Sequence, residues 1–281
     1  MNNTELIVGA INPGYGGLPI GVAAALGGAT LAWHAHPGQA ADYPGRTVMR
    51  YHHPHAGAHT VVDAIPPMVD VLTVNGYDDW TITGTSLIDA GYKPPLVVVE
   101  VQLPNDEAVP ICEYLDSHGY HSVWRCLCSN EVGTPHQRLR SYAVGVRNDC
   151  PVPGVNAAYM DADPWTGTRW SSPSAECTYL DSEAYRWAQA ELEGKADSRA
   201  LEHWGEVTGE PYPYPLYTLP STRSGLSVGF VEWMMGLPIG YVSSPFLQLT
   251  TDQRMSLLYS GTVPLQAAHA AALILTQMEA K

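Results

Sequence analysis

The chain has 281 residues, 45% hydrophobic and 15% charged, which predicts a folded globular protein with ample material for a core. Its 28 acidic and 14 basic residues give a formal net charge of −14, and such a field repels the phosphates of DNA. No apolar run reaches the roughly 18–20 residues that cross a bilayer. The first residues lack the basic charges of a signal peptide, so we expect a cytoplasmic protein. The five cysteines form no CxxC pair and are expected to be free thiols.

Strands and helices are expected to alternate along the first half of the chain. Short apolar runs bounded by turn residues predict strands at 6–8, 31–33, 69–73, 96–99, 122–126 and 141–146, and helices are expected at 20–26 and 111–118. Continuous apolar strands are typical of a parallel sheet that is buried on both faces. The alternation therefore predicts an α/β fold with a doubly wound, mostly parallel sheet.

Changes in composition suggest three segments. Residues 1–147 are interpreted as the core domain. Residues 148–222 are rich in Pro, Gly, Trp, Tyr and acidic side chains, which predicts a smaller, irregular second lobe. Residues 223–281 return to an apolar style and end in a helical run at 265–278, so we expect them to rejoin the core.

Five sequence blocks occur in an order that is typical of one enzyme family. They are GYGGL at 14–18, VVEV at 98–101, GTPHQRLR at 133–140, FVEWMMGLPIG at 230–240 and GTVPLQA at 261–267. Together they resemble the motifs of bacterial and phage DNA cytosine-5 methyltransferases. The resemblance implies a Rossmann-like, S-adenosylmethionine-dependent methyltransferase fold. It also places the second lobe at the position of the region that reads the target DNA.

The resemblance breaks at the nucleophile. The family attacks cytosine with a cysteine thiolate that follows a proline, whereas this chain reads VNGYDDW at 74–80, with Tyr77 or Asp78 at the cysteine position. A tyrosine hydroxyl with a pKa of ~10 is a poor substitute for a thiol with a pKa of ~8.5. We therefore predict no catalytic residue acting by the family mechanism.

Three charged residues of the family pattern are retained. By the resemblance Glu100 contacts the target cytosine, and the alternative is a structural carboxylate at the end of its strand. Arg138 and Arg140 alternate along a strand-like segment and therefore share one face. They bind an anion or pair with Glu100, and we favour the pairing.

The cofactor pocket also departs from the family pattern. The resemblance assigns Gly14, Gly16 and Gly17 to the cofactor loop, but Asn12 replaces the customary Phe. His36 stands where the family has the acid that binds the ribose, and Ala58 stands near the position of the Asp that faces the adenine. A neutral histidine cannot accept both ribose hydroxyls as a carboxylate does. We therefore expect a degenerate pocket and no cofactor, S-adenosylmethionine included.

Six histidines lie within residues 34–59, and short spacings of imidazoles can hold zinc. The candidate ligands are His36, His55 and His59. No Cys or Glu completes a spacing such as H-E-x-x-H, so we predict no metal site. Tyr77 and Asp78, together with the following acid Asp79, are an alternative acid–base group for altered chemistry.

Residues 151–215 carry 11 acidic side chains against 4 basic ones, the wrong sign for a DNA clamp. The same segment is rich in Trp and Tyr, which are enriched at protein interfaces. The leading hypothesis is a catalytically inactive, phage-encoded homologue that acts in the host cytoplasm through protein contacts, in a structural, regulatory or anti-defence role. Two alternatives remain: a repurposed enzyme acting on a nucleotide or modified base, and a DNA-binding module without catalysis. An oligomer is possible, and no membrane association is expected.

Overall fold

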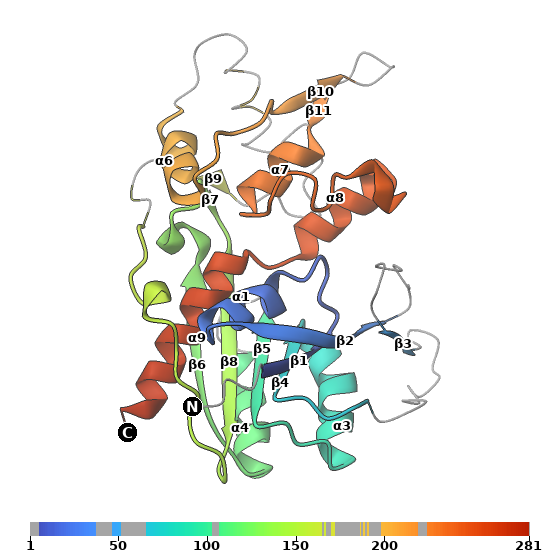
Figure 1. The fold of residues 1–281 in the computed structure, drawn as a ribbon, viewed down its shortest axis with the longest axis vertical. Coiled ribbons are helices and arrows are strands. Elements are labelled where there is room, and N and C mark those ends of the chain that lie inside the picture. Colours follow the sequence, from blue (N-terminus) through green and yellow to red (C-terminus); the bar gives the residue numbers. More distant parts are fainter. Residues whose placement is uncertain are drawn as a thin grey trace. The chain divides into compact units, whose positions relative to one another are not determined.

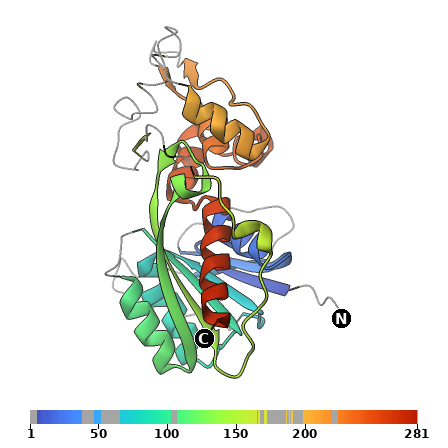
Figure 2. The ribbon, with the colours of Figure 1, turned by 90° about the vertical axis from the view of Figure 1, so that its left-hand side faces the viewer.

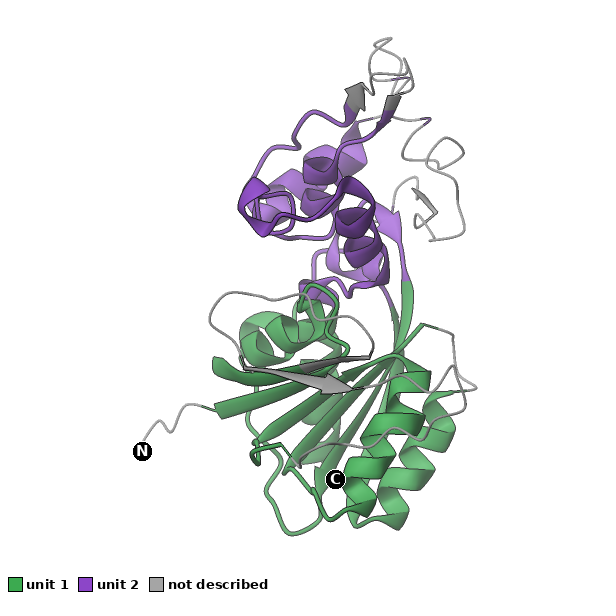
Figure 3. Cartoon of the chain, turned by 90° about the vertical axis from the view of Figure 1, so that its right-hand side faces the viewer, with its two compact units in different colours: residues 1–127, 139–161, 267–281 green, residues 128–138, 162–266 purple. Residues whose placement is uncertain are grey.

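The computed structural model describes residues 6–37, 47–51, 66–102, 107–164, 166, 170, 171, 186, 188, 190, 198–218 and 224–280. The chain divides into two compact units (Figure 3). Unit 1 comprises residues 1–127, 139–161 and 267–281, and unit 2 comprises residues 128–138 and 162–266.

This division differs from the expected one, in which the core resumed at residue 223. The structure instead groups 223–266 with unit 2. The apolar stretch beyond 223 supplies buried side chains to helices α7 (Val228–Met234) and α8 (Thr251–Ser260), which pack against each other.

Unit 1 is built on a seven-stranded sheet with the order β3-β2-β1-β4-β5-β8-β6 (Figure 1). Its strands are β1 (Leu6–Ile11), β2 (Ala29–Pro37), β3 (Thr47–Tyr51), β4 (Val71–Asn75), β5 (Leu96–Val101), β6 (Tyr120–Cys128) and β8 (Leu139–Arg147). The pairings from β3 through to β5 are parallel, and β8 runs antiparallel to β5. This confirms the predicted doubly wound, mostly parallel sheet.

Helices cover both faces of this sheet. They are α1 (Gly17–Ala25), α2 (Tyr77–Asp79), α3 (Thr85–Asp89), α4 (Ala108–Ser117) and α9 (Pro264–Glu279), with a π-helical turn (Trp80–Gly84) between α2 and α3. Side chains alternate along β5, so Val97 and Val99 join the core cluster under α3 and α4, while Val98 joins the cluster under α1 and α9. The red α9 and the green α4 accordingly lie on opposite sides of the sheet (Figure 2).

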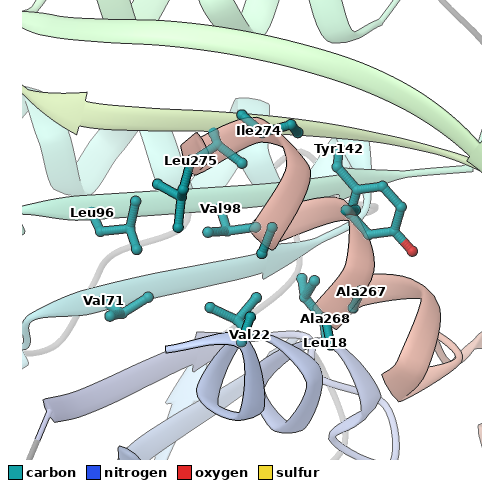
Figure 4. Packing of buried hydrophobic residues seen from close by; sticks show 14 of the residues in the cluster. Leu18, Val22, Val71, Leu96, Val98, Tyr142, Ala267, Ala268, Ile274 and Leu275 are labelled. Atoms are coloured by element: carbon teal, nitrogen blue, oxygen red, sulfur yellow. The ribbon is translucent and has the colours of Figure 1, made fainter. Parts of the chain in front are cut away.

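The cluster under α1 and α9 shows why the last helix packs closely (Figure 4). Leu18 and Val22 of α1 meet the alanine-rich face of α9 and the side chains of β4 and β5. Ala267 and Ala268 are almost fully buried, because small side chains let a helix approach the sheet closely. Burial of these apolar surfaces is the main stabilising contribution to this face.

Unit 2 is smaller and mostly helical in its described part. Its elements are β7 (His136–Gln137), β9 (Trp170–Ser171), α6 (Arg199–Thr208), β10 (Leu216–Thr218), β11 (Ser224–Leu226), α7 (Val228–Met234) and α8 (Thr251–Ser260). Its core contains Trp204 and Trp233, and the Trp204 indole donates to the Trp233 carbonyl at 2.9 Å. Among the residues described in the two units, no helix is long and apolar enough to cross a membrane.

Candidate functional site

The candidate site lies where the connections of the parallel sheet change direction. β1 lies between β2 and β4. From β1 the chain adds β2 and β3 on one side, and it then returns to add β4 and β5 on the other side. Open α/β sheets bind ligands outside the carboxyl ends of the strands at such a switch point. Here the loop after β1 and the helical turn after β4 meet.

The loop after β1 has the backbone of a tight ligand-binding turn. Gly14 and Gly16 have φ of 56° and 98°, in the left-handed region that glycine occupies without penalty. The Gly16 amide donates to the Pro13 carbonyl at 2.7 Å, and Gly16 then precedes α1 without a side-chain cap. The first amide groups of α1, those of Gly17 and Leu18, therefore donate to no capping side chain.

The three residues after β4 and Gly76 point in different directions. Tyr77 is half-buried and packs against the core cluster under α3 and α4. Asp78 is exposed. Asp79 is buried, with 8% of its surface exposed, and its Oδ2 accepts a hydrogen bond of 2.7 Å from the Asn12 amide. This bond ties Asp79 to the loop that carries the glycines.

Glu100 and Arg140 form a buried ion pair, with Arg140 Nε 2.5 Å from Glu100 Oε1 and side chains 10% and 1% exposed for the arginine and the glutamate. Glu100 lies beside Asn75 across the β4–β5 pairing, so its carboxylate belongs to the same sheet edge. The favoured pairing therefore holds for Arg140.

Arg138 behaves differently. It precedes β8 and belongs to unit 2, where its guanidinium donates to the carbonyls of Leu258 and Tyr259 in the last turn of α8. A cation at a helix C-terminus is stabilised by the helix dipole. Arg138 is thus a structural residue of unit 2. Its position is set by the end of α8 and not by a strand face shared with Arg140.

The cysteines of the described segments lie on other elements. Cys112 is on α4, Cys126 and Cys128 are on β6, and Cys150 follows β8; all four are free thiols. Burial raises the pKa of the Cys112 thiol, a nearby Asp116 adds to the shift, and a hydrogen bond with Ser122 opposes it. A raised pKa keeps this thiol protonated and makes it a poor nucleophile.

Several predicted site residues fall outside the described residues. These are Ala58, His55 and His59. The backbone of His36 is in β2, opposite Arg50 of β3. Within the described segments, no three His, Cys, Asp or Glu side chains gather as a metal site.

The contact between Asn12 and Asp79 was not foreseen from the sequence. Each position stood out separately, one as the replacement of a Phe and the other as an acid after the cysteine position. The signal that could have joined them is topological, because they follow β1 and β4, which are adjacent parallel strands.

Comparisons with known proteins agree with this architecture. Residues 104–203 match the family model described as C-5 cytosine-specific DNA methylase. Over this segment the chain is similar to the C-5 cytosine-specific DNA methylases. A comparison with curated protein sequences gives no match.

Solved methylase-fold structures resemble the chain over nearly its whole length. The Schizosaccharomyces pombe Dnmt2 methyltransferase has a TM-score of 0.58 at 11% identity, covering 98% of this chain and 99% of that one. A mutant DNMT2 of Spodoptera frugiperda has a TM-score of 0.57 at 13% identity, covering 97% and 100%. A putative DNA modification methyltransferase from an Escherichia coli prophage has a TM-score of 0.52 at 12% identity, covering 97% and 100%. At these identities the likeness shows the fold.

The expectation that no cofactor binds is wrong in the light of these matches. The methylase family and the matching methyltransferase structures require a methyl donor, so S-adenosylmethionine is the expected cofactor. The glycine loop fits this ligand, because Gly14 and Gly16 let the backbone approach closely. The uncapped start of α1 suits the carboxylate of its methionine end. Both features come from the backbone and do not depend on His36 or Ala58.

Proposed function

We propose that this methylase relative binds S-adenosylmethionine but does not carry out cysteine-dependent methyl transfer, and that it acts through protein contacts. A phage-encoded structural, regulatory or anti-defence factor is the setting that we favour. The observation that carries the proposal is the turn after β4, which begins with Tyr77 and the exposed Asp78 where the family places its cysteine.

The chemistry explains why this turn matters. Methyl transfer to cytosine C5 begins when a thiolate attacks C6, and a tyrosine hydroxyl at ordinary pH is scarcely ionised. Tyr77 is further occupied by packing against the core. Cys112, the nearest cysteine in sequence, is on α4 and has a raised pKa. None of these groups offers a nucleophile of the family type.

The cofactor would be held mainly by backbone groups. The glycine loop and the first turn of α1 would receive its methionine end, and the bound cofactor would supply an activated methyl group on its sulfonium. The buried Glu100–Arg140 pair fixes the shape of the neighbouring sheet edge. In this role the chain's own residues bind and orient, and they move no proton.

Protein contact is supported by apolar side chains that the second unit leaves exposed. Ile239 and Phe246 are 60% and 92% exposed, and both lie on the segment between α7 and α8. This segment is held by Glu232, which accepts hydrogen bonds from the amides of Gly240, Val242 and Ser243. Large apolar side chains on a pre-organised loop are a favourable anchor for a partner, because little conformational entropy is lost on binding. The net charge of −14 favours a protein over a nucleic acid as that partner.

Calorimetry with S-adenosylmethionine and a methyl-transfer assay on cytosine-containing DNA test the two halves of this proposal. We expect saturable cofactor binding without labelled DNA or a covalent protein–DNA complex. Gly16→Ala should weaken binding about tenfold or more, because φ 98° is strained for a residue that carries a Cβ and the loop would have to change its backbone. The exposed Gly154, whose added Cβ would meet open space, serves as the control through Gly154→Ala. Absence of binding by the wild-type chain would refute the cofactor half, and transfer of label would refute the inactive half.

A further inference from the structure

One side chain joins the two segments that meet at the switch point. Asn12 Nδ2 donates to Asp79 Oδ2 at 2.7 Å and to the Asn75 carbonyl at 3.2 Å. The loop after β1 is therefore joined to the end of β4 and to the helical turn that follows it. This is the loop whose shape decides whether a cofactor can be received.

The backbone at Asn12 shows that the contact matters to the loop. Its φ of 47° is in the left-handed region, which non-glycine residues adopt uncommonly, although asparagine tolerates it best. The same residue is followed by Gly14 and Gly16 with positive φ. A hydrogen bond to a carboxylate is roughly twice as strong as a neutral one, so Asp79 can hold Asn12 in this conformation.

Asp79 is itself firmly anchored. It ends α2, and the chain continues into the π-helical turn Trp80–Gly84, a form of helix that is rare and often found at functional sites. The Trp80 ring is 1% exposed and lies against Gly84, where an added Cβ would come within 2.5 Å of it. The Thr85 hydroxyl donates to the Thr81 carbonyl at 2.7 Å. These contacts fix the helical turn that follows Asp79, and so the backbone from which its carboxylate meets Asn12.

We propose that the Asn12–Asp79 hydrogen bond is a clasp that positions the glycine loop for the cofactor. The inference rests on the proposed function, since it concerns how the same site attains its affinity. Asn12 and Asp79 are positioning residues: they shape the loop, and the backbone of the loop contacts the ligand. Without the clasp, part of the binding free energy is spent on ordering the loop, and the apparent affinity falls.

A reciprocal exchange of the two side chains tests the clasp. Asn12→Asp places two carboxylates together and should raise the Kd for S-adenosylmethionine by about tenfold or more, as expected for a lost charge-assisted hydrogen bond. Adding Asp79→Asn restores one amide and one carboxylate and should return the Kd part of the way to that of the wild type, because the bond from position 12 to the Asn75 carbonyl stays lost. Asp161→Asn, at an exposed position of the same unit, is the control and should leave the Kd unchanged.

Amide exchange of residues 12–17 in the protein without cofactor provides a second readout. Exchange should quicken in the Asn12→Asp variant and slow again in the double variant. If the double variant binds no better than Asn12→Asp, one of the side chains contacts the cofactor directly and the positioning role is refuted. If the wild-type chain binds no cofactor, the proposed function fails, whereas unchanged exchange in Asn12→Asp would refute the clasp itself.

Discussion

The contact between Gly9 and Trp33 gives the sharpest test of how the sheet beneath the site is packed. Gly9 lies in β1, and the Trp33 ring of β2 crosses it so closely that an added Cβ would be 2.3 Å from Cζ2 and 2.5 Å from Cε2. Trp33 is 2% exposed, and its indole donates to the Pro67 carbonyl at 3.0 Å. The β1–β2 register shifts between Val8 and Gly9, at the point where the ring is accommodated.

The substitution Gly9→Ala should therefore destabilise unit 1. Real Cβ contacts essentially never fall below 3.0 Å, so the ring has to move. Overpacking a core costs about 1–3 kcal/mol. A displaced indole also loses its bond to the Pro67 carbonyl, and leaving a buried donor unsatisfied costs about 1–3 kcal/mol more. We expect a total loss of roughly 2–6 kcal/mol in the free energy of unfolding.

Urea unfolding followed by tryptophan fluorescence and circular dichroism measures this loss. Gly154→Ala is the matched control, because its added Cβ meets nothing within 4 Å, and it should change the free energy by under about 1 kcal/mol. Trp33→Phe removes the atoms that the new Cβ would strike, so Gly9→Ala should cost much less in that background. An equal cost of Gly9→Ala in both backgrounds would show that the ring contact is not the cause.

Two further predictions concern buried carboxylates. Arg140→Met leaves Glu100 as an unpaired buried charge and should lower the free energy of unfolding by about 3–5 kcal/mol. The double variant Glu100→Leu/Arg140→Met should recover most of this loss in urea unfolding. A double variant as unstable as Arg140→Met would contradict the reasoning. Glu232→Gln keeps the shape of a side chain that accepts four hydrogen bonds, three from backbone amides and one of 2.7 Å from the Ser243 hydroxyl. It should cost about 1.5–3 kcal/mol in the melting of unit 2, while Glu206→Gln, at an exposed position of α6, should be neutral.

The sheet was predictable because its signal is local. β4 and β5 are short runs in which every residue is buried, and a continuous apolar run of that length, bounded by turn residues, is typical of a strand covered on both faces. The doubly wound order then follows from the alternation of strands and helices. The boundary at residue 223 was less predictable, because the composition of an apolar segment does not indicate which of two cores it packs into. Phe230 and Trp233 in fact stack in the core of unit 2.

The site was only partly predictable, because its partners are distant in the sequence. The expectation that Arg138 and Arg140 share one strand face requires one continuous strand, but β8 begins at Leu139. The carbonyls that Arg138 meets lie more than a hundred residues later. The cofactor expectation was wrong because it counted side chains at His36 and Ala58. The shape of the glycine loop depends on the positive φ angles of Gly14 and Gly16. A change of side chain at a distant position has little effect on these angles.

The retained Glu100–Arg140 pair is weak support for retained catalysis. Replacing either partner alone leaves an unpaired charge in a buried place, and that penalty holds whether or not a reaction occurs. The contact between Asn12 and Asp79 is more informative about the site. Asn12 stands where the methylase pattern has a Phe, Asp79 follows the position of the family's cysteine, and the two side chains contact each other at 2.7 Å. A substitution at either position removes this bond, which ties the glycine loop to the turn that follows β4.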